Sequence, residues 1–346
     1  SQRMDVPAVA TYIGKGKVVE VAEAAKAASA NVVIFDDELS PSQQRNLENA
    51  LGTKVIDRTA LILDIFATRA QTREGRLQVS LAQMQYLLPR LAGQWSHLER
   101  MEGAIGTRGP GETQIETDRR LIRSRISRIK RELEDVRTQR ALYRRRRVRN
   151  GLPVVALVGY TNAGKSTLMN GLAKAGVLAE NRLFATLDPV TRRLRLPTGE
   201  TVLLTDTVGF IQKLPTDLVA SFRATLEELG EADLVLHVID ISHANAFEQS
   251  QTVEATLRDL EVVEKPTLLV LNKCDLLSTA DGGRVESLDD ARSVVAAAGV
   301  PPANVVMVSA LKRWGLDDLL ARVARALDGD LGDARAEGSA FLAHSG

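Results

Sequence analysis

The first part of the chain alternates short apolar runs with amphipathic stretches. Val32–Phe35 and Lys54–Asp57 are typical of buried strands, and Val19–Ala28 is typical of a helix. A second helix is expected to begin at Ser40-Pro41, because proline fits the first helical turn and serine caps it. This alternation of strands and helices predicts a small α/β subdomain over residues 1–71, with parallel strands.

The apolar period changes between residues 72 and 149, where spacings of three and four alternate as in a helix with one apolar stripe. The segment 101–111 between two such runs is too rich in glycine and proline to continue a helix. We therefore predict a long antiparallel helical hairpin with a glycine-rich tip, and a kink at Pro89 in its first arm. The first run is Leu77, Leu81, Met84, Leu88, Leu91, Trp95 and Leu98, and the second is Ile115, Ile122, Ile126, Ile129, Leu133, Val136 and Tyr143, with Arg119 and Arg140 in two of its seam positions.

Apolar strands and amphipathic helices alternate again from residue 150 to 328, which predicts an α/β domain with a doubly wound, mostly parallel sheet. Strands are expected near 154–158, 192–196, 201–205, 233–239, 267–271 and 304–308, and helices near 165–173, 215–229, 245–260, 288–298 and 316–327. Residues 329–346 are rich in Gly, Ala, Asp and Ser, so we expect a flexible tail there.

A glycine-rich loop follows the first strand of this domain. Residues 159–166 match G-x-x-x-x-G-K-S/T between a strand and a helix, a context that disfavours a chance glycine turn. In such a P-loop, backbone N–H groups and a helix N-terminus face the phosphates. Lys165 is expected to act in catalysis on the β- and γ-phosphates, and Ser166 to bind Mg²⁺. The expected nucleotide contacts are Gly159, Asn162, Ala163, Gly164, Lys165, Ser166 and Thr167.

A D-x-x-G sequence closes the strand near 201–205. Asp206 can hold Mg²⁺ there, and Gly209 can offer its N–H to the γ-phosphate during catalysis. Alone this sequence usually marks a turn, but its position after the P-loop favours the functional interpretation. Thr186, between the two motifs, can complete Mg²⁺ coordination when the γ-phosphate is present, unless it is an ordinary loop threonine.

The sequence Asn272-Lys273-Cys274-Asp275 after the strand near 267–271 predicts a site that reads the base. The carboxylate of Asp275 can accept from two donors of guanine, and adenine would leave this charge unpaired. Ser309-Ala310 can present a backbone N–H to the guanine oxygen. Alone, residues 272–275 would suit a capping turn. In order with the other motifs they predict an enzyme that hydrolyses GTP to GDP.

These motifs in this order resemble the GTPases of the translation-factor-related class. Outside them, Arg108–Arg120 resembles the signature of the HflX family of ribosome-binding GTPases. Thr11–Lys17, Asp36–Pro41 and Asp57–Thr59 with Ile62–Phe66 agree with the same family. The resemblance extends from about Thr11 to Leu327, although the chain begins short of the family's full N-terminal domain and has no room for the small C-terminal domain of some members.

The resemblance implies binding to the 50S ribosomal subunit, including its 23S rRNA, and separation of 70S ribosomes into subunits. It also implies that the glycine-rich tip reaches ribosomal RNA near the peptidyl-transferase centre. Two other interpretations stay open. The apolar stripes could serve a protein partner in a signalling adaptor, or the chain could act in tRNA modification, for which no catalytic cysteine or one-carbon-cofactor motif is evident.

Charge adds a reason to expect RNA. The whole chain carries a net charge of only +1, but residues 112–150 hold 14 Lys or Arg against 6 Asp or Glu. A basic segment on a slightly acidic body suggests a polyanionic partner, with a solvated helix face as the alternative. The candidate RNA contacts are Arg108, Arg119, Arg120 and Arg123, within a wider basic set.

The remaining features bear on the rate of hydrolysis, on ion binding and on the location of the protein in the cell. Phe210 stands where many GTPases place a glutamine that orients water, so slow intrinsic turnover is expected. Asn162 could help to bind K⁺ beside the phosphates or only stabilise its loop. Gly14–Lys17 could suggest a second phosphate site, but it lacks a preceding strand and a following Ser or Thr, so a structural turn is expected there. His97, His237 and His243 lack metal-ligand spacing and are expected to be structural. The single Cys274 and the lack of an apolar run long enough to span a membrane favour a cytoplasmic protein, which we expect to be monomeric.

Overall fold

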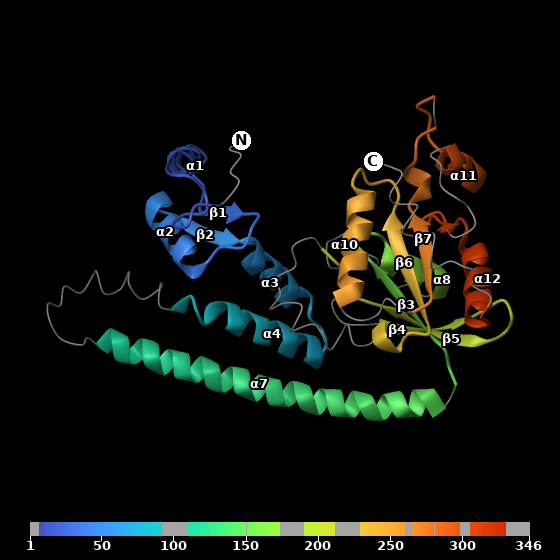
Figure 1. The fold of residues 1–346 in the computed structure, drawn as a ribbon, viewed down its shortest axis with the longest axis horizontal. Helices are drawn as coiled ribbons and strands as arrows, with labels where there is room; N and C mark the ends of the chain where they lie inside the picture. The colour runs from blue at the N-terminus through green and yellow to red at the C-terminus, as the bar shows by residue number, and fades with distance from the viewer. Residues whose placement is uncertain are drawn as a thin grey trace. The chain divides into compact units, whose positions relative to one another are not determined.

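The computed structural model describes residues 7–91, 110–149, 151–173, 190–211, 229–259, 265–279, 281–297 and 305–329 (Figure 1). Of these residues, those up to Val136 belong to one compact unit and those from Arg137 onward to another. None of the described helices is both long enough and apolar enough to cross a membrane.

The first unit contains the predicted α/β subdomain. Its helices α1, α2 and α3 are Lys15–Ala27, Pro41–Leu51 and Arg58–Arg69, and its strands β1 and β2 are Val32–Phe35 and Lys54–Asp57. The two strands pair in parallel, as predicted. Ser40 accepts a hydrogen bond from the backbone of Gln43 and Pro41 occupies the first turn, so α2 begins where its capping chemistry predicts. Leu39, Leu47 and Val55 form the buried core beneath these elements.

One local prediction in this unit was wrong. The stretch Gly14–Lys17 does not form a turn, because Gly14 is the extended N-cap of α1 and the helix begins at Lys15. An ion pair of 2.6 Å between Lys17 and Glu20 lies inside this first part of the helix. The helix therefore starts earlier than the predicted Val19.

The two arms of the hairpin include α4, Arg73–Leu87, and α7, Pro110–Arg149. Arg73, at the start of α4, lies 3.5 Å from Glu132, well along α7, as expected for antiparallel arms. Ile129 of the predicted stripe is buried on α7. Helix α4 ends two residues before Pro89, and a turn interrupts the arm where the kink was predicted.

More residues of α4 are buried than the predicted apolar stripe contains. Glu74, Gln78 and Ala82 are buried in addition to Leu81, so a wider surface than the stripe is covered. Helix α7 starts at Pro110, which takes two residues from the predicted tip, because proline is suited to the first turn of a helix. The rest of the tip, residues 101–109, lies outside the described residues, as do the predicted helix near 215–229 except Leu229 and the tail after Gly329.

A buried ion pair between Arg90 and Asp57 fastens the end of the first arm to the α/β subdomain. The Asp57 carboxylate accepts from the Leu39 N–H at 3.2 Å, the Ala60 N–H at 2.8 Å and the Tyr86 hydroxyl at 2.9 Å. Arg90 lies 3.2 Å from the same carboxylate, donates to the Leu39 carbonyl at 2.6 Å, and stacks 3.5 Å from the centre of the Tyr86 ring. Burial and the charge of Asp57 raise the pKa of Tyr86, which keeps its hydroxyl protonated and donating.

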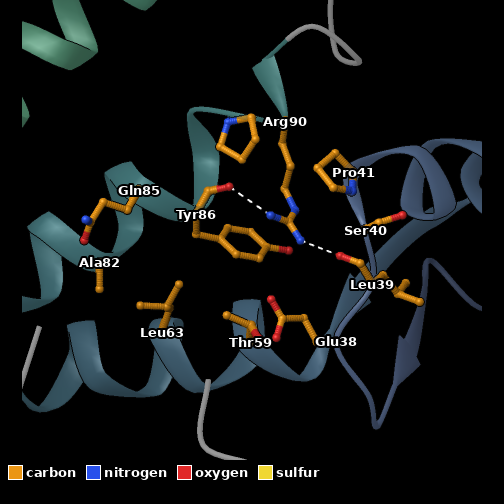
Figure 2. Close-up of a pocket in the computed structure, with 11 residues that line it drawn as sticks. Glu38, Leu39, Ser40, Pro41, Thr59, Leu63, Ala82, Gln85, Tyr86 and Arg90 are labelled. Carbon is orange, nitrogen blue, oxygen red and sulfur yellow. Dashed lines mark hydrogen bonds between the residues drawn. The ribbon is translucent and has the colours of Figure 1, made fainter. Parts of the chain in front are cut away.

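A cavity of about 470 Å³ lies beside this ion pair (Figure 2). Its walls include Glu38–Pro41 and Thr59, which belong to two of the stretches that resemble the HflX family. The Thr59 hydroxyl is buried and makes no hydrogen bond to any residue that the structure describes. Stretches that are separate in the sequence thus meet where the first arm joins the subdomain.

The second unit is built on a six-stranded sheet with the strand order β4-β5-β3-β6-β7-β8. The strands are Val190–Arg195 (β4), Thr201–Asp206 (β5), Val154–Gly159 (β3), Leu234–Asp240 (β6), Thr267–Asn272 (β7) and Val305–Met307 (β8). All neighbouring pairs are parallel except β4 with β5, an antiparallel edge. The predicted mostly parallel sheet is confirmed.

Helices cover both faces of this sheet (Figure 1). They are Lys165–Ala173 (α8), Ala246–Asp259 (α10), Leu288–Ala297 (α11) and Leu316–Leu327 (α12). Along β7, Val270 packs with α8 and α12, whereas Leu269 and Leu271 pack with α11. This alternation buries nearly every residue of β3, β5, β6 and β7 on one face or the other, so the loops at the carboxyl edge remain to carry polar side chains.

Candidate nucleotide-binding site

The P-loop lies between β3 and α8 in the form that its sequence requires. Gly159 and Gly164 have φ values of 153° and 93°, which side chains rarely tolerate. A Cβ at Gly159 would overlap the backbone of Val238, and one at Gly164 would overlap the Asn272 amide. The glycines are therefore needed for close approach as well as for backbone conformation. Exposed Asn162 also adopts a left-handed φ of 63°.

Lys165 opens α8 and is buried beneath this loop. Its Nζ donates to the carbonyl oxygens of Gly159 at 2.9 Å and Tyr160 at 3.0 Å. Burial lowers the pKa of Lys165 to about 8, while the negative charge of Asp206 acts in the opposite direction. A partly desolvated cation at a helix N-terminus is well placed to interact strongly with a phosphate.

The expected metal ligands of two motifs meet at the ends of β3 and β5. Ser166 donates from its hydroxyl to Asp206 Oδ2 at 2.7 Å. Asp206 is the last residue of β5 and pairs in register with Leu157 of β3. A hydroxyl and a carboxylate are hard oxygen donors, so this pair fits Mg²⁺. Thr186, the third predicted ligand, lies outside the described residues.

The D-x-x-G loop lies directly against the P-loop. Phe210 donates from its N–H to the Gly159 carbonyl at 3.1 Å, and its own carbonyl accepts from the Thr161 N–H at 2.7 Å. A Cβ on Gly209 would come within 2.8 Å of Thr161 Cα, so a glycine is needed there. The Phe210 side chain is buried and carries no polar group, so it cannot orient water by hydrogen bonding.

Asn272 ties three of the predicted loops together. Its Nδ2 donates to the Ala163 carbonyl of the P-loop at 2.8 Å, and its Oδ1 accepts from the Ala310 N–H at 3.1 Å. Asn272 and Ser309 are buried, and a backbone bridge from Ser309 to Trp314 shapes the last loop. Phosphate and base motifs thus converge at one edge of the sheet.

The base-reading motif continues into a short 3-10 helix, η2, Cys274–Leu276. Lys273 precedes it with a left-handed φ of 63°, and its Nζ lies 2.7 Å from Asp240 Oδ2. Asp275 lies within η2 and is half-buried. Asp240 was not among the predicted site residues, although it directly follows a predicted strand, because only the pairing of β6 with β7 brings it beside Lys273.

His237 of β6 was expected to be structural, and it lies in the sheet near this site. It is buried, and its Nε2 has no hydrogen-bond partner within the described part of the chain. Burial lowers the pKa of His237 to about 4, and the positive charge of Lys165 contributes. The ring is therefore neutral at physiological pH.

Comparison with known families covers most of the chain. Residues 1–67 match the family described as GTP-binding GTPase N-terminal, 69–147 the GTP-binding GTPase Middle Region, and 154–273 the 50S ribosome-binding GTPase. A GTPase HflX from Caldanaerobacter subterraneus subsp. tengcongensis is 50% identical over 318 residues, or 92% of this chain and 70% of that protein. The chain belongs to the HflX family of GTPases.

Other HflX proteins agree with this assignment. The GTPase HflX of Alkalihalophilus pseudofirmus is 58% identical over 80% of this chain and 65% of its own length, and that of Escherichia coli is 56% identical over 77% and 62%. The chain therefore spans about two thirds of the length of these curated relatives. A solved GTP-binding protein from Sulfolobus solfataricus in complex with GDP is 25% identical, covering 94% of this chain and 89% of that chain, with a TM-score of 0.48. Membership in HflX makes the second unit the domain of a GTP hydrolase.

Proposed function

We propose that this HflX GTPase binds the 50S ribosomal subunit through the basic surface of α7 and separates 70S ribosomes into subunits. The observation that carries the proposal is a strip of basic side chains without acidic partners. Arg119, Arg123 and Lys130 follow one another on α7 at spacings of four and seven, so they share one side of the helix. Within the described part of the chain, these three side chains make no ion pair.

Two acidic residues share this side of α7, because Glu116 lies three residues before Arg119 and Glu134 four residues after Lys130, but the ion pairs seen on α7 involve Glu132. Glu132 is paired with Arg128 at 3.6 Å and with Arg73 at 3.5 Å. A merely solvated face would pair its cations in this way with neighbours one turn apart. Arg120 and Arg125 are also exposed and unpaired among the described residues. Unpaired cations in this arrangement suit the phosphates of ribosomal RNA.

The description of the family matched by residues 154–273, a 50S ribosome-binding GTPase, agrees with this proposal. The adaptor alternative is weakened because Ile129 is buried and Ile126 and Leu133 are half-buried, so this part of the stripe is not fully open to a partner. No described residue favours tRNA modification. Arg108, the remaining predicted RNA contact, lies outside the described residues and stays a prediction.

Within the GTPase domain, the bound nucleotide is expected to lie across the edge where the motifs converge. Lys165 and the N–H of Gly209 would hold the γ-phosphate, and Asp275 would accept from the guanine base. Ser166, Asp206 and Thr186 would hold Mg²⁺, which supplies charge neutralisation at the β- and γ-phosphates when bound. The remaining nucleotide contacts would come from Gly159, Asn162, Ala163, Gly164, Thr167, Asn272, Lys273, Ser309 and Ala310.

The buried Phe210 implies that the isolated protein hydrolyses GTP slowly and that a ribosome-bound state accelerates it. Turnover should therefore be measured with and without purified 50S subunits. An increase on adding subunits is expected, and equal rates would reject stimulation by the ribosome. The same assay in potassium and sodium salts would test whether Asn162 helps to bind K⁺.

Binding itself is tested by co-sedimentation with 50S subunits in GTP, GDP and a non-hydrolysable GTP analogue. Binding that depends on the nucleotide supports the proposal, whereas binding only to another protein would support the adaptor. Loss of 70S light scattering on adding protein and GTP would measure separation into subunits.

A matched pair of variants locates the RNA contact. Arg123→Gln removes an unpaired cation, so it should weaken 50S binding and reduce the slope of log affinity against log salt by about 1. Arg128→Gln removes a cation that is already paired with Glu132, and its effect should be smaller. Equal behaviour of both variants, or binding that is independent of salt, would contradict a phosphate interface on this strip.

A further inference from the structure

Asp240 lies next to the loop that is expected to read the base. It is the last residue of β6 and pairs in register with Asn272, the last residue of β7. Its Oδ2 lies 2.7 Å from the Nζ of Lys273, and the two side chains are 11% and 24% exposed. An acidic side chain from one strand thus holds the cation of the motif on the next strand.

Other bonds fix the Asp240 carboxylate in this orientation. Oδ1 accepts from the Ser242 N–H at 3.1 Å and from the Ser242 hydroxyl at 2.6 Å. The Ile241 N–H donates to the Asn272 carbonyl at 3.1 Å, which keeps the ends of the strands together. One carboxylate oxygen is therefore occupied by its own turn, and the other is left for Lys273.

Lys273 is held in a demanding conformation. Its φ of 63° lies in the left-handed region that side chains other than glycine seldom adopt. Its Cε lies 3.9 Å from the position that a Cβ on Gly164 would take, so its aliphatic stem runs close to the P-loop. Such strain at a site is maintained only where surrounding contacts determine it, and the Asp240 pair is one of these contacts.

The sequence of the motif creates a conflict between charges. Lys273 and Asp275 are two residues apart in one short loop and carry opposite charges. Asp275 must keep its carboxylate free if it is to accept hydrogen bonds from guanine, and a nearby ammonium would compete for it. Among the described residues, Asp275 makes no ion pair, whereas Lys273 is paired with Asp240.

We propose that Asp240 is a positioning residue for guanine specificity: it holds the Lys273 ammonium away from Asp275 and so keeps Asp275 available to the base. This inference rests on the proposed base site at Asp275. Asp240 need not touch the nucleotide, since it acts through Lys273. Without the Asp240 carboxylate, Lys273 would be free to pair with Asp275. Nucleotides that lack hydrogen-bond donors for Asp275 would then bind less weakly relative to guanine nucleotides.

A double-mutant cycle separates this role from a structural one. Asp240→Asn keeps the shape of the side chain but removes its charge, and Lys273→Met keeps an aliphatic stem but removes the ammonium. The dissociation constants of GDP and of inosine diphosphate, which lacks the exocyclic amine, are measured by displacement of a fluorescent GDP. Asp240→Asn should weaken GDP binding about tenfold, within the range of coupled neighbours. The substitution should also reduce the ratio of the dissociation constant of inosine diphosphate to that of GDP.

In the Lys273→Met background, Asp240→Asn should have no further effect, because no ammonium remains to be controlled. An equal loss in both backgrounds would overturn the proposal, and so would an unchanged preference between the two nucleotides. Asp289→Asn, which removes the carboxylate of an exposed pair with Arg292 at 3.1 Å, is the matched control and should leave binding unchanged.

Asp275→Ala distinguishes failure of this inference from failure of the base site. If Asp275→Ala abolishes the preference for GDP but Asp240→Asn does not alter it, the base site stands and the role of Asp240 is rejected. If Asp275→Ala leaves that preference intact, the base site itself is misplaced, and the inference falls with it.

Discussion

Replacing Asn272 with alanine should loosen the whole nucleotide edge, because this one amide connects loops that are distant in the chain. The substitution removes the donor to the Ala163 carbonyl and the acceptor for the Ala310 N–H. Asn272 is 1% exposed, so water cannot easily replace either bond. Two buried backbone groups would then lack partners.

The size of the effect follows from those two groups. Leaving a buried polar group unsatisfied costs about 1–3 kcal/mol. We therefore expect the free energy of unfolding of this unit to fall by about 2–6 kcal/mol in total, a large part of a typical domain stability of about 5–15 kcal/mol. GDP affinity should fall as well, since the P-loop and the Ser309-Ala310 loop lose their common support.

Urea unfolding followed by tryptophan fluorescence would measure this change. The chain has 2 tryptophans, so a Trp95→Phe background leaves Trp314, which lies in the loop supported by Asn272, as the reporter. Ser293→Ala is the matched control, because it removes an exposed hydrogen bond of 3.0 Å in the same unit and should change stability by less than about 0.5 kcal/mol. An Asn272→Ala protein as stable as this control would refute the reasoning.

Three further predictions concern buried or strained groups. The His237 ring is neutral in the folded protein because its pKa is lowered to about 4, whereas its pKa in the unfolded chain is 6.5. Between these two pKa values the unfolded chain binds more protons than the folded one. The free energy of unfolding therefore falls as the pH falls through this range. From pH 7 to pH 5 the parent should lose about 2 kcal/mol more than His237→Leu in urea unfolding, and equal losses would contradict the assignment. Gly164→Ala should abolish binding of fluorescent GDP, whereas Gly199→Ala should not, because both have positive φ but only Gly164 is close to Asn272. Arg90→Met should destabilise the first unit by about 3–5 kcal/mol by leaving buried Asp57 without its cation, and adding Asp57→Asn should restore part of this loss in circular dichroism melts; no restoration would argue against the ion pair as the cause.

Local chemistry determined much of this protein directly. The capping serine and proline at Ser40-Pro41, the β1 and β2 strands, and the P-loop between strand and helix depend on residues close together in the sequence. Family membership was also readable from the sequence, because the signature Arg108–Arg120 is long and contiguous. Such features need only short-range backbone preferences and periodicity to be recognised.

The tertiary structure decided which distant groups meet. Nothing local predicts that Asn272 bonds to both Ala163 and Ala310, that Asp240 pairs with Lys273, or that Arg90 reaches Asp57. These contacts follow from the order and register of parallel strands and from the packing of α4, which depend on the burial of apolar surface across the whole unit. Sequence periodicity specifies which face of a helix or strand is apolar, but only packing determines which other element that face contacts. Packing therefore also determines which partner each polar side chain at the end of an element meets.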